Sequence, residues 1–192
     1  RSIRRDISDE AYLYVYYASL SDEEDALQAI YQFLRVGFAT GSSVLEQYAN
    51  PSVMRIVELR RKVGNECHHF REFARFESLN GSVYVSHLEP KSDVIMLVGR
   101  HFADRMPSEH WMIIDDKRKI ACIHQKDGTN YLRYLTDEEF DTLRKTEEYT
   151  DTYTDLWKTF FHAVGIKERE NYICQRNLFP KWKRKHAVEF RE

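Results

Sequence analysis

The chain has 192 residues, 42% hydrophobic and 31% charged, a composition typical of a globular protein large enough to bury a core. Its formal net charge of -2 excludes a protein that binds nucleic acid through an overall positive charge. The three cysteines, at 67, 122 and 174, are too widely spaced for a disulfide framework or a thiolate zinc site, and they fit a reducing compartment.

No apolar run approaches the roughly 18 residues that a membrane-spanning helix needs, and no signal peptide is visible. We therefore expect a cytoplasmic protein without membrane contact. Because Arg1 is not an initiator methionine, we also expect the natural N-terminus to lie further upstream.

The first third of the chain has the apolar spacing of helices. Asn50 before Pro51 is the pattern of a helix cap followed by proline at the first helical position. From there the apolar residues keep three-to-four spacing, at Ile56, Leu59, Val63, Cys67 and Phe70. This predicts a long helix with one buried stripe.

The next segment contains the strongest local signal, two alternating runs joined by Asn80-Gly81. Asn-Gly favours a two-residue hairpin turn because both turn positions need positive φ. We therefore predict an antiparallel hairpin of residues 72–79 and 82–89.

The register of this hairpin decides which side chains share a face. A two-residue turn places Leu79 opposite Ser82. One face, directed toward the core, then carries Phe76, Val83, Val85 and His87. The other face brings together Phe73, Arg75 and Tyr84.

The rest of the sequence alternates helical and extended signals. Ser92-Asp93 begins a predicted helix that ends before Pro107, and short strands follow at 110–115, 119–124 and 129–135. Thr136 with Glu139 forms a capping box at the start of a helix that we expect to continue to Gly165.

The predicted fold class is α+β, an antiparallel sheet of about five strands in a β-β-α-β-β-β core, flanked by N-terminal and C-terminal helices. We expect a single domain over residues 1–192. It comprises a helical part at 1–70, a β-rich core at 71–135, and C-terminal helices with a basic tail at 136–192.

Residues 67–76 read Cys-His-His-Phe-Arg-Glu-Phe-Ala-Arg-Phe. This run resembles the His-x-x-(Lys/Arg)-x-Phe-x-Arg-Phe signature of a bacterial family, domain of unknown function 4130, whose members are labelled DNA metabolism or DNA repair proteins. Glu72 departs from the glycine that is common there. The similarity spans most of the chain and returns at residues 81–84, 101–107, 111–118 and 168–171.

The resemblance implies a bacterial protein of DNA metabolism. Family members tend to be encoded beside a radical S-adenosylmethionine (radical SAM) protein assigned to DNA modification or repair, and some are fused to a uracil-DNA-glycosylase-like domain. This context implies a partner but supplies no mechanism.

Five polar residues are catalytic candidates: His68, Arg75, His101, Arg105 and Asp115. Asp115-Asp116 resembles the paired carboxylates that bind Mg²⁺ in nucleases, but the same doublet is also an ordinary turn sequence. His101 also fits a core histidine on an apolar helix stripe, with Arg105 one turn further on the same face.

We expect neither a bound metal nor a cofactor. His68 and His69 are adjacent on a predicted helix and point about 100° apart, so they do not converge on one ion. The sequence contains no phosphate-binding loop, no dinucleotide fingerprint and no three-cysteine radical SAM motif.

A second set of residues suits binding to nucleic acid or a partner: Arg71, Phe73, Arg75, Tyr84, Lys181, Trp182 and Arg184. Arginine among aromatic rings can hold a phosphate while the rings stack on unpaired bases, so single-stranded DNA is the favoured ligand. The alternative is that helices cover the sheet face and that the tail is only a solvated terminus.

The leading hypothesis is an accessory factor of DNA metabolism or repair that binds nucleic acid or the radical SAM protein. The main alternative is an enzyme that acts on nucleic acid through the His/Arg/Asp cluster. A scaffold that contacts only the partner protein is a third possibility.

Overall fold

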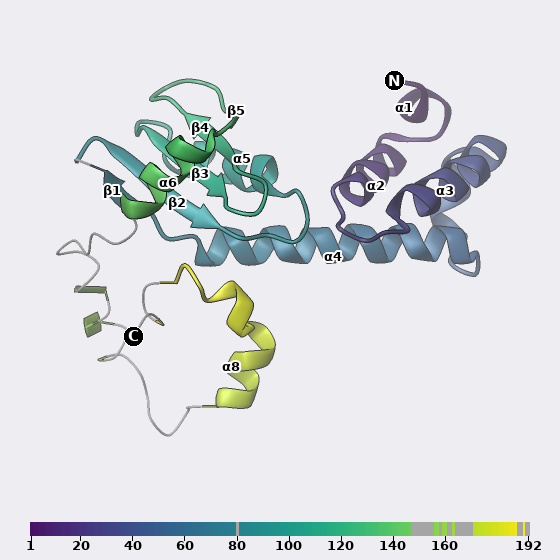
Figure 1. Cartoon of the computed structure of the whole chain (residues 1–192). Helices are drawn as coiled ribbons and strands as arrows, with labels where there is room; N and C mark the ends of the chain where they lie inside the picture. Colours follow the sequence, from purple (N-terminus) through teal and green to yellow (C-terminus); the bar gives the residue numbers. More distant parts are fainter. Residues whose placement is uncertain are drawn as a thin grey trace. The chain divides into compact units, whose positions relative to one another are not determined.

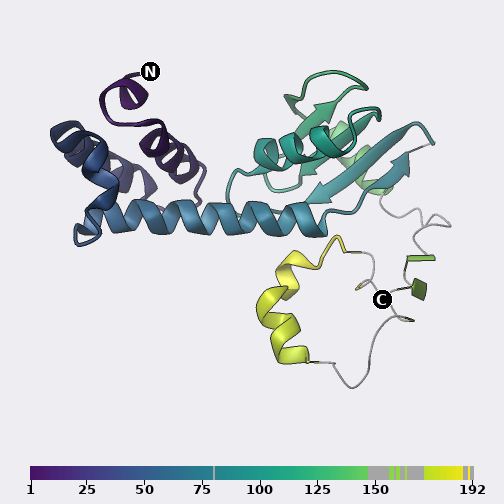
Figure 2. The same cartoon turned by 180° about the vertical axis from the view of Figure 1, so that it is seen from behind.

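The computed structural model describes residues 1–79, 81–146, 156–157, 159–160, 163, 171–187 and 190 (Figures 1 and 2). The chain forms two compact units. Unit 1 contains Arg1–His69 together with Pro90–Val94, and unit 2 contains Phe70–Glu89 together with Ile95–Glu192.

Unit 1 is helical, as predicted. Its elements are α1 (Ser2–Asp6), α2 (Asp9–Ser19), α3 (Ala26–Thr40), the 3₁₀ helix η1 (Gly41–Glu46) and α4 (Pro51–Phe73), whose last turn belongs to unit 2. The Asn50 side chain accepts a hydrogen bond from the Ser52 amide at 3.0 Å, which confirms the predicted start of α4. The predicted stripe of α4 is buried, with Ile56, Leu59 and Val63 almost inaccessible.

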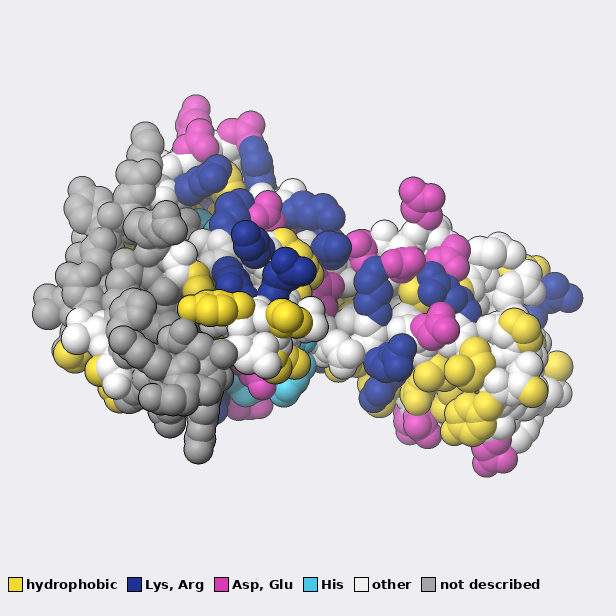
Figure 3. Space-filling model, turned by 90° about the horizontal axis from the view of Figure 1, so that it is seen from below, with side chains coloured by type: hydrophobic (Ala, Val, Ile, Leu, Met, Phe, Trp, Pro, Cys, Tyr) yellow, Lys and Arg dark blue, Asp and Glu magenta, His cyan; other side chains and the backbone are white. Residues whose placement is uncertain are grey.

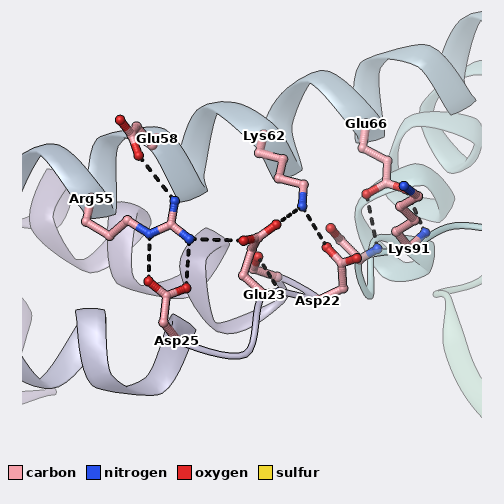
Figure 4. A network of polar contacts seen from close by, with 10 residues as sticks. Asp22, Glu23, Asp25, Arg55, Glu58, Lys62, Glu66 and Lys91 are labelled. Atoms are coloured by element: carbon pink, nitrogen blue, oxygen red, sulfur yellow. Dashed lines mark hydrogen bonds and ion pairs between the residues drawn. The ribbon is translucent and has the colours of Figure 1, made fainter.

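Ion pairs join the 22–25 segment to α4 within unit 1 (Figure 4). Arg55 holds Asp25 at 2.7 Å and Glu23 at 3.1 Å, and Lys62 pairs with Asp22 and Glu23. These bonds lower the pKa of the Glu23 and Asp25 carboxyl groups. The role of these ion pairs is structural, because the acidic side chains of the segment and the basic side chains of α4 neutralise one another.

Unit 2 is built on a five-stranded sheet. The strands are β1 (Glu77–Leu79), β2 (Val83–Leu88), β3 (Trp111–Asp115), β4 (Ile120–His124) and β5 (Tyr131–Tyr134), and they lie in that order. The α+β class is therefore confirmed, but the expectation of an antiparallel sheet is inexact, since β2 and β3 are parallel. α5 (Ile95–Arg105) forms the crossover that a parallel pair requires.

The hairpin exists, but its predicted register is wrong by one residue. Leu79 pairs with Val83 instead of Ser82, so residues 80–82 form the connection, and Asn80 lies outside the described residues. Gly81 has the positive φ (+71°) that the turn requires. This register places Leu79 with Val83 and Val85 on one buried face, where all three contribute to an apolar cluster.

The shift in register separates the side chains that were expected to share the hairpin's second face. Phe73 ends α4 instead of lying in a strand, and Arg75 lies in the connection between α4 and β1. Phe76 packs against Phe102 and Trp111 on the α5 side of the sheet, whereas Val83 and Val85 face the other side.

The two faces of the sheet are covered by different helices. α5 packs on β3 and β4 and lies in front of the sheet in Figure 2. α6 (Asp137–Thr146) lies in front of it in Figure 1 and contributes Phe140 and Leu143 to the opposite apolar cluster. Thr136 and Glu139 form the predicted capping box, with bonds of 3.0 and 3.2 Å.

The predicted continuation of α6 to Gly165 falls largely outside the described residues. Beyond it, the structure describes α8 (Tyr172–Leu178) and the 3₁₀ helix η3 (Lys181–Lys183). Among the helices of the described residues, none is long and apolar enough to cross a membrane.

Candidate functional site

The parallel pairing of β2 and β3 brings the carboxyl ends of both strands to one edge of the sheet. His87 is the penultimate residue of β2, and Asp116 directly follows β3. The Asp116 amide donates a hydrogen bond to the Leu88 carbonyl at 2.9 Å, which continues the ladder by one residue. Side chains at the carboxyl ends of adjacent parallel strands are well placed to form a site.

His87 and Asp116 form a buried imidazole–carboxylate pair. His87 Nδ1 lies 2.7 Å from Asp116 Oδ1, and their side chains are only 2% and 7% exposed. The other carboxylate oxygen lies 3.7 Å from Nε2 of His186, and the two imidazole rings stack with centroids 6.1 Å apart. We call His87, Asp116 and His186 the His–Asp–His cluster.

The C-terminal segment holds His186 against this edge. Ala187 is buried, and Lys185 forms an ion pair with Glu89, which follows β2, at 2.7 Å. The Arg184 guanidinium lies over the rings of Phe179 and Phe190, and its Nε donates to the Phe179 carbonyl at 2.7 Å. The segment is therefore packed onto unit 2.

Asp115 has a different environment from its neighbour. It is completely buried, its Oδ1 accepts hydrogen bonds from the Lys117 and Arg118 amides at 3.0 Å, and its Oδ2 accepts from the Arg118 guanidinium at 2.8 Å. Burial raises the pKa of the Asp115 carboxyl, and the bonds from Arg118 offset this only in part. This aspartate shapes the turn between β3 and β4, in keeping with the turn interpretation of the doublet.

The five catalytic candidates are not gathered at one place within unit 2. Arg105 ends the helix that precedes β3 and Asp115 ends β3 itself, so they belong to opposite ends of the strand. Burial and the nearby Arg71 and Arg105 lower the pKa of His101, whose ring packs on Phe102. His68 belongs to unit 1.

The arginines and aromatic residues of the predicted binding set make internal contacts. Phe73 stacks on Phe179 with ring centroids 3.9 Å apart, and Arg71 donates to the Leu97 carbonyl at 3.1 Å. Arg75 donates to two backbone carbonyls and lies over the Trp157 ring.

The other members of the set differ in exposure. Tyr84 is half-buried in β2 opposite Ser78, and Arg184 is packed as described above. Lys181 is exposed, and Trp182 is 40% exposed. The accessible part of the predicted surface is therefore the C-terminal segment.

Sequence reasoning missed the His–Asp–His cluster. The sequence pattern assigns His87 to the core face and Asp116 to a turn doublet, and it gives no signal for His186. A prediction of parallel pairing between β2 and β3 would have pointed to His87 and Asp116, because the carboxyl ends of parallel neighbours meet at one edge of the sheet. The predicted antiparallel sheet gives no such signal.

A hollow of about 440 Å³ lies between the sheet and α6. Its walls are mostly apolar, with Met112, Ile123, Leu135 and Leu143, and an ion pair between Arg133 and Glu139 stands at its rim. Within the part of the chain that the structure describes, no group of three or more His, Cys, Asp or Glu side chains could hold a metal ion.

A family model described as a domain of unknown function (DUF4130) matches residues 24–189. No curated protein and no solved structure matches the chain.

Proposed function

The chain belongs to the DUF4130 family, a domain of unknown function. We propose that it is an accessory protein of DNA metabolism that binds single-stranded nucleic acid. The observation that carries the proposal is the composition and exposure of residues 171–187, which we call the basic segment.

The basic segment has no acidic residue in its sequence, although the whole chain is slightly acidic. Its basic residues are Arg176, Lys181, Lys183, Arg184 and Lys185. On the face drawn in Figure 3, Lys and Arg side chains of unit 2 lie together beside hydrophobic ones. Such a local concentration of positive charge attracts phosphates despite a net charge near zero.

Trp182 gives the segment a preference for unpaired bases. The indole is 40% exposed and stands between basic residues in η3. A partly exposed ring can stack on a base, and stacking needs a base that is free of its partner strand. The Lys185–Glu89 ion pair is at the surface and is worth little, so a phosphate can replace Glu89 as the partner of this lysine.

A fluorescence anisotropy titration with single-stranded and duplex oligonucleotides tests the proposal. We expect tighter binding of the single strand, and a loss of about 1–3 kcal/mol for Trp182→Ala with no change in salt dependence. The double variant Arg176→Ala/Lys181→Ala should reduce the slope of log affinity against log salt by roughly 1.4, the value for two phosphates on a single strand.

Lys126→Ala is the matched control, because Lys126 is exposed and basic but lies in the turn after β4. It should leave affinity and slope unchanged. Equal effects of the control and the double variant would show that only general charge matters, and the absence of binding at low salt would refute the proposal.

Exposed apolar side chains favour a second candidate function. Tyr172, Ile173 and Leu178 are large and well exposed on the short helix α8. Such a surface suits a protein partner, and the family resemblance implies the radical SAM protein. Pull-down of that protein by the intact chain, lost in Ile173→Asp/Leu178→Asp, would support this function.

An enzyme acting on nucleic acid is the remaining alternative. The five predicted residues do not gather within unit 2, as described above. Any such activity therefore needs another set of groups, and the His–Asp–His cluster offers one.

A further inference from the structure

Two buried histidines of the same sheet differ in how their nitrogens are satisfied. His124 is 3% exposed, and both of its ring nitrogens have partners, Asn130 Oδ1 at 2.8 Å and the Pro107 carbonyl at 3.2 Å. His87 is 4% exposed, and its Nδ1 faces Asp116. In the described structure, the buried Nε2 of His87 has no hydrogen-bond partner.

A buried nitrogen without a partner costs free energy, so native proteins rarely keep one without a functional reason. The comparison with His124 shows that this sheet can satisfy a histidine completely. The open nitrogen of His87 therefore requires an explanation.

Asp116 determines which nitrogen of His87 carries the hydrogen. An ionised carboxylate only accepts hydrogen bonds, so the Nδ1 that faces it is the protonated nitrogen, and Nε2 presents a lone pair. The carboxylate is itself held in place, since its backbone amide bonds to the Leu88 carbonyl and its second oxygen faces His186. A carboxylate held in this way fixes both the tautomer and the orientation of the ring.

The charges around the pair come from three segments. The C-terminal segment supplies His186 and Lys185, and the end of β2 supplies Glu89, the partner of that lysine. The turn after β3 supplies the buried Asp115 and its partly exposed partner Arg118. Lys185 is the cation most readily transferred to an incoming anion, because its pair with Glu89 is exposed.

We propose that His87 is a general base. Its Nε2 takes the proton of a bound water or ligand hydroxyl, and Asp116 stabilises the resulting imidazolium as a positioning residue. The O–H bond breaks and its electron pair stays on the oxygen, which attacks the phosphorus of a phosphate ester. A new P–O bond forms, and the bond between phosphorus and the leaving oxygen of the ester breaks. The leaving oxygen takes the proton back from His87, so the base is regenerated.

The substrate class, a phosphate ester of the nucleotide type, rests on the proposed function, whereas the role of His87 as a base does not. Access to His87 requires the segment 185–186 to move away, because His186 supplies the ring that stacks on His87. The polar contacts that hold it to the strand ends are a surface ion pair and a 3.7 Å contact, both of them weak.

Chemical modification of the intact chain tests whether the nitrogen is available. Diethyl pyrocarbonate acylates unprotonated imidazole nitrogens, and peptide mass spectrometry reads each histidine separately. We expect His87 to react about ten-fold faster than His124, since no bond has to break at its Nε2. Lys185→Ala should speed modification of His87 and leave His124 unchanged, and equal rates at the two histidines would overturn the proposal.

Hydrolysis of thymidine 5′-(p-nitrophenyl phosphate) tests the base chemistry. His87→Asn keeps an N–H toward Asp116 but has no equivalent of Nε2, so turnover should fall by a factor on the order of 100 or more while the fold is retained. His124→Asn is the matched control and should keep turnover in the folded fraction.

The two proposals fail separately. No turnover by a chain that still binds single-stranded DNA would overturn the base and leave the proposed function standing. Turnover without DNA binding would refute the proposed function and leave the role of His87 as a general base standing.

Discussion

The two faces of the sheet in unit 2 differ in how completely they are packed. The α5 face is closed: Trp111, Ile113 and Cys122 are almost inaccessible, and His124 is bonded at both nitrogens. The α6 face keeps a hollow of about 440 Å³ beside the helix. His87, whose Nε2 has no hydrogen-bond partner in the described structure, lies on the same face as Val85 by strand alternation.

The α5 face therefore carries groups that maintain the fold, whereas the α6 face carries groups that are available for binding or chemistry. A closed face gains stability from dense packing, and it tolerates few changes. An incompletely satisfied face costs some stability and leaves room for a ligand or a reaction. Substitutions on the two faces should therefore have unequal effects, as follows.

Gly99→Ala should have the largest effect, because α5 lies directly on β4 at this position. A Cβ at residue 99 would be 2.4 Å from the Cys122 sulfur, so the helix has to move. We expect a loss of about 3 kcal/mol of unfolding free energy, measured by urea denaturation. Gly64→Ala in α4 is the control, since its nearest neighbour is 4.0 Å away, and it should gain about 0.5–1 kcal/mol.

The paired variants His124→Asn and His87→Asn compare the two histidines directly. Both keep the N–H or its equivalent at the Nδ1 position and remove Nε2. Only at His124 does this break a hydrogen bond, the one to the Pro107 carbonyl, so His124→Asn should cost about 1–3 kcal/mol more than His87→Asn. Equal losses in urea denaturation would mean that Nε2 of His87 has a partner in solution.

The buried thiol on the closed face should make stability depend on pH at the alkaline end. Burial raises the pKa of Cys122 to about 11 from the ordinary 9.0. The unfolded chain therefore loses this proton at a lower pH than the native chain, and stability should fall as the pH rises through this range. Cys122→Ala should flatten that decline, and at pH 8 a thiol reagent should reach the exposed Cys174 but not Cys122.

Leu143→Phe should have the smallest effect, because the hollow on the α6 face can accept the larger side chain. We expect a change within about 1 kcal/mol in urea denaturation, below the cost of overpacking a closed core. A loss as large as that of Gly99→Ala would show that the α6 face is packed as tightly as the α5 face.

The positions of the strands and the starts of two helices were predictable from local sequence. The strands at β3, β4 and β5 begin and end within two residues of their predicted limits. Asn50 and Thr136 cap α4 and α6 as expected, because a cap is a contact between residues two or three positions apart.

The hairpin register and the direction of β2 against β3 were not predictable in the same way. A turn motif limits the length of a loop but does not determine it, and here burial of Leu79 with Val83 accompanies one additional loop residue. Parallel pairing depends on where a crossover helix packs. The sequences of β2 and β3 by themselves therefore do not indicate whether the two strands pair in parallel.

The candidate site depends entirely on these non-local choices. The sequence identifies histidines and aspartates as separate residues and correctly marks residues 171–187 as basic. Only the folded chain brings His87 to Asp116 across parallel strand ends and adds His186 from the far C-terminal segment. Local energetics act over a few residues, whereas the chemistry of a site comes from contacts between residues that are distant in the chain, and tertiary packing decides these contacts.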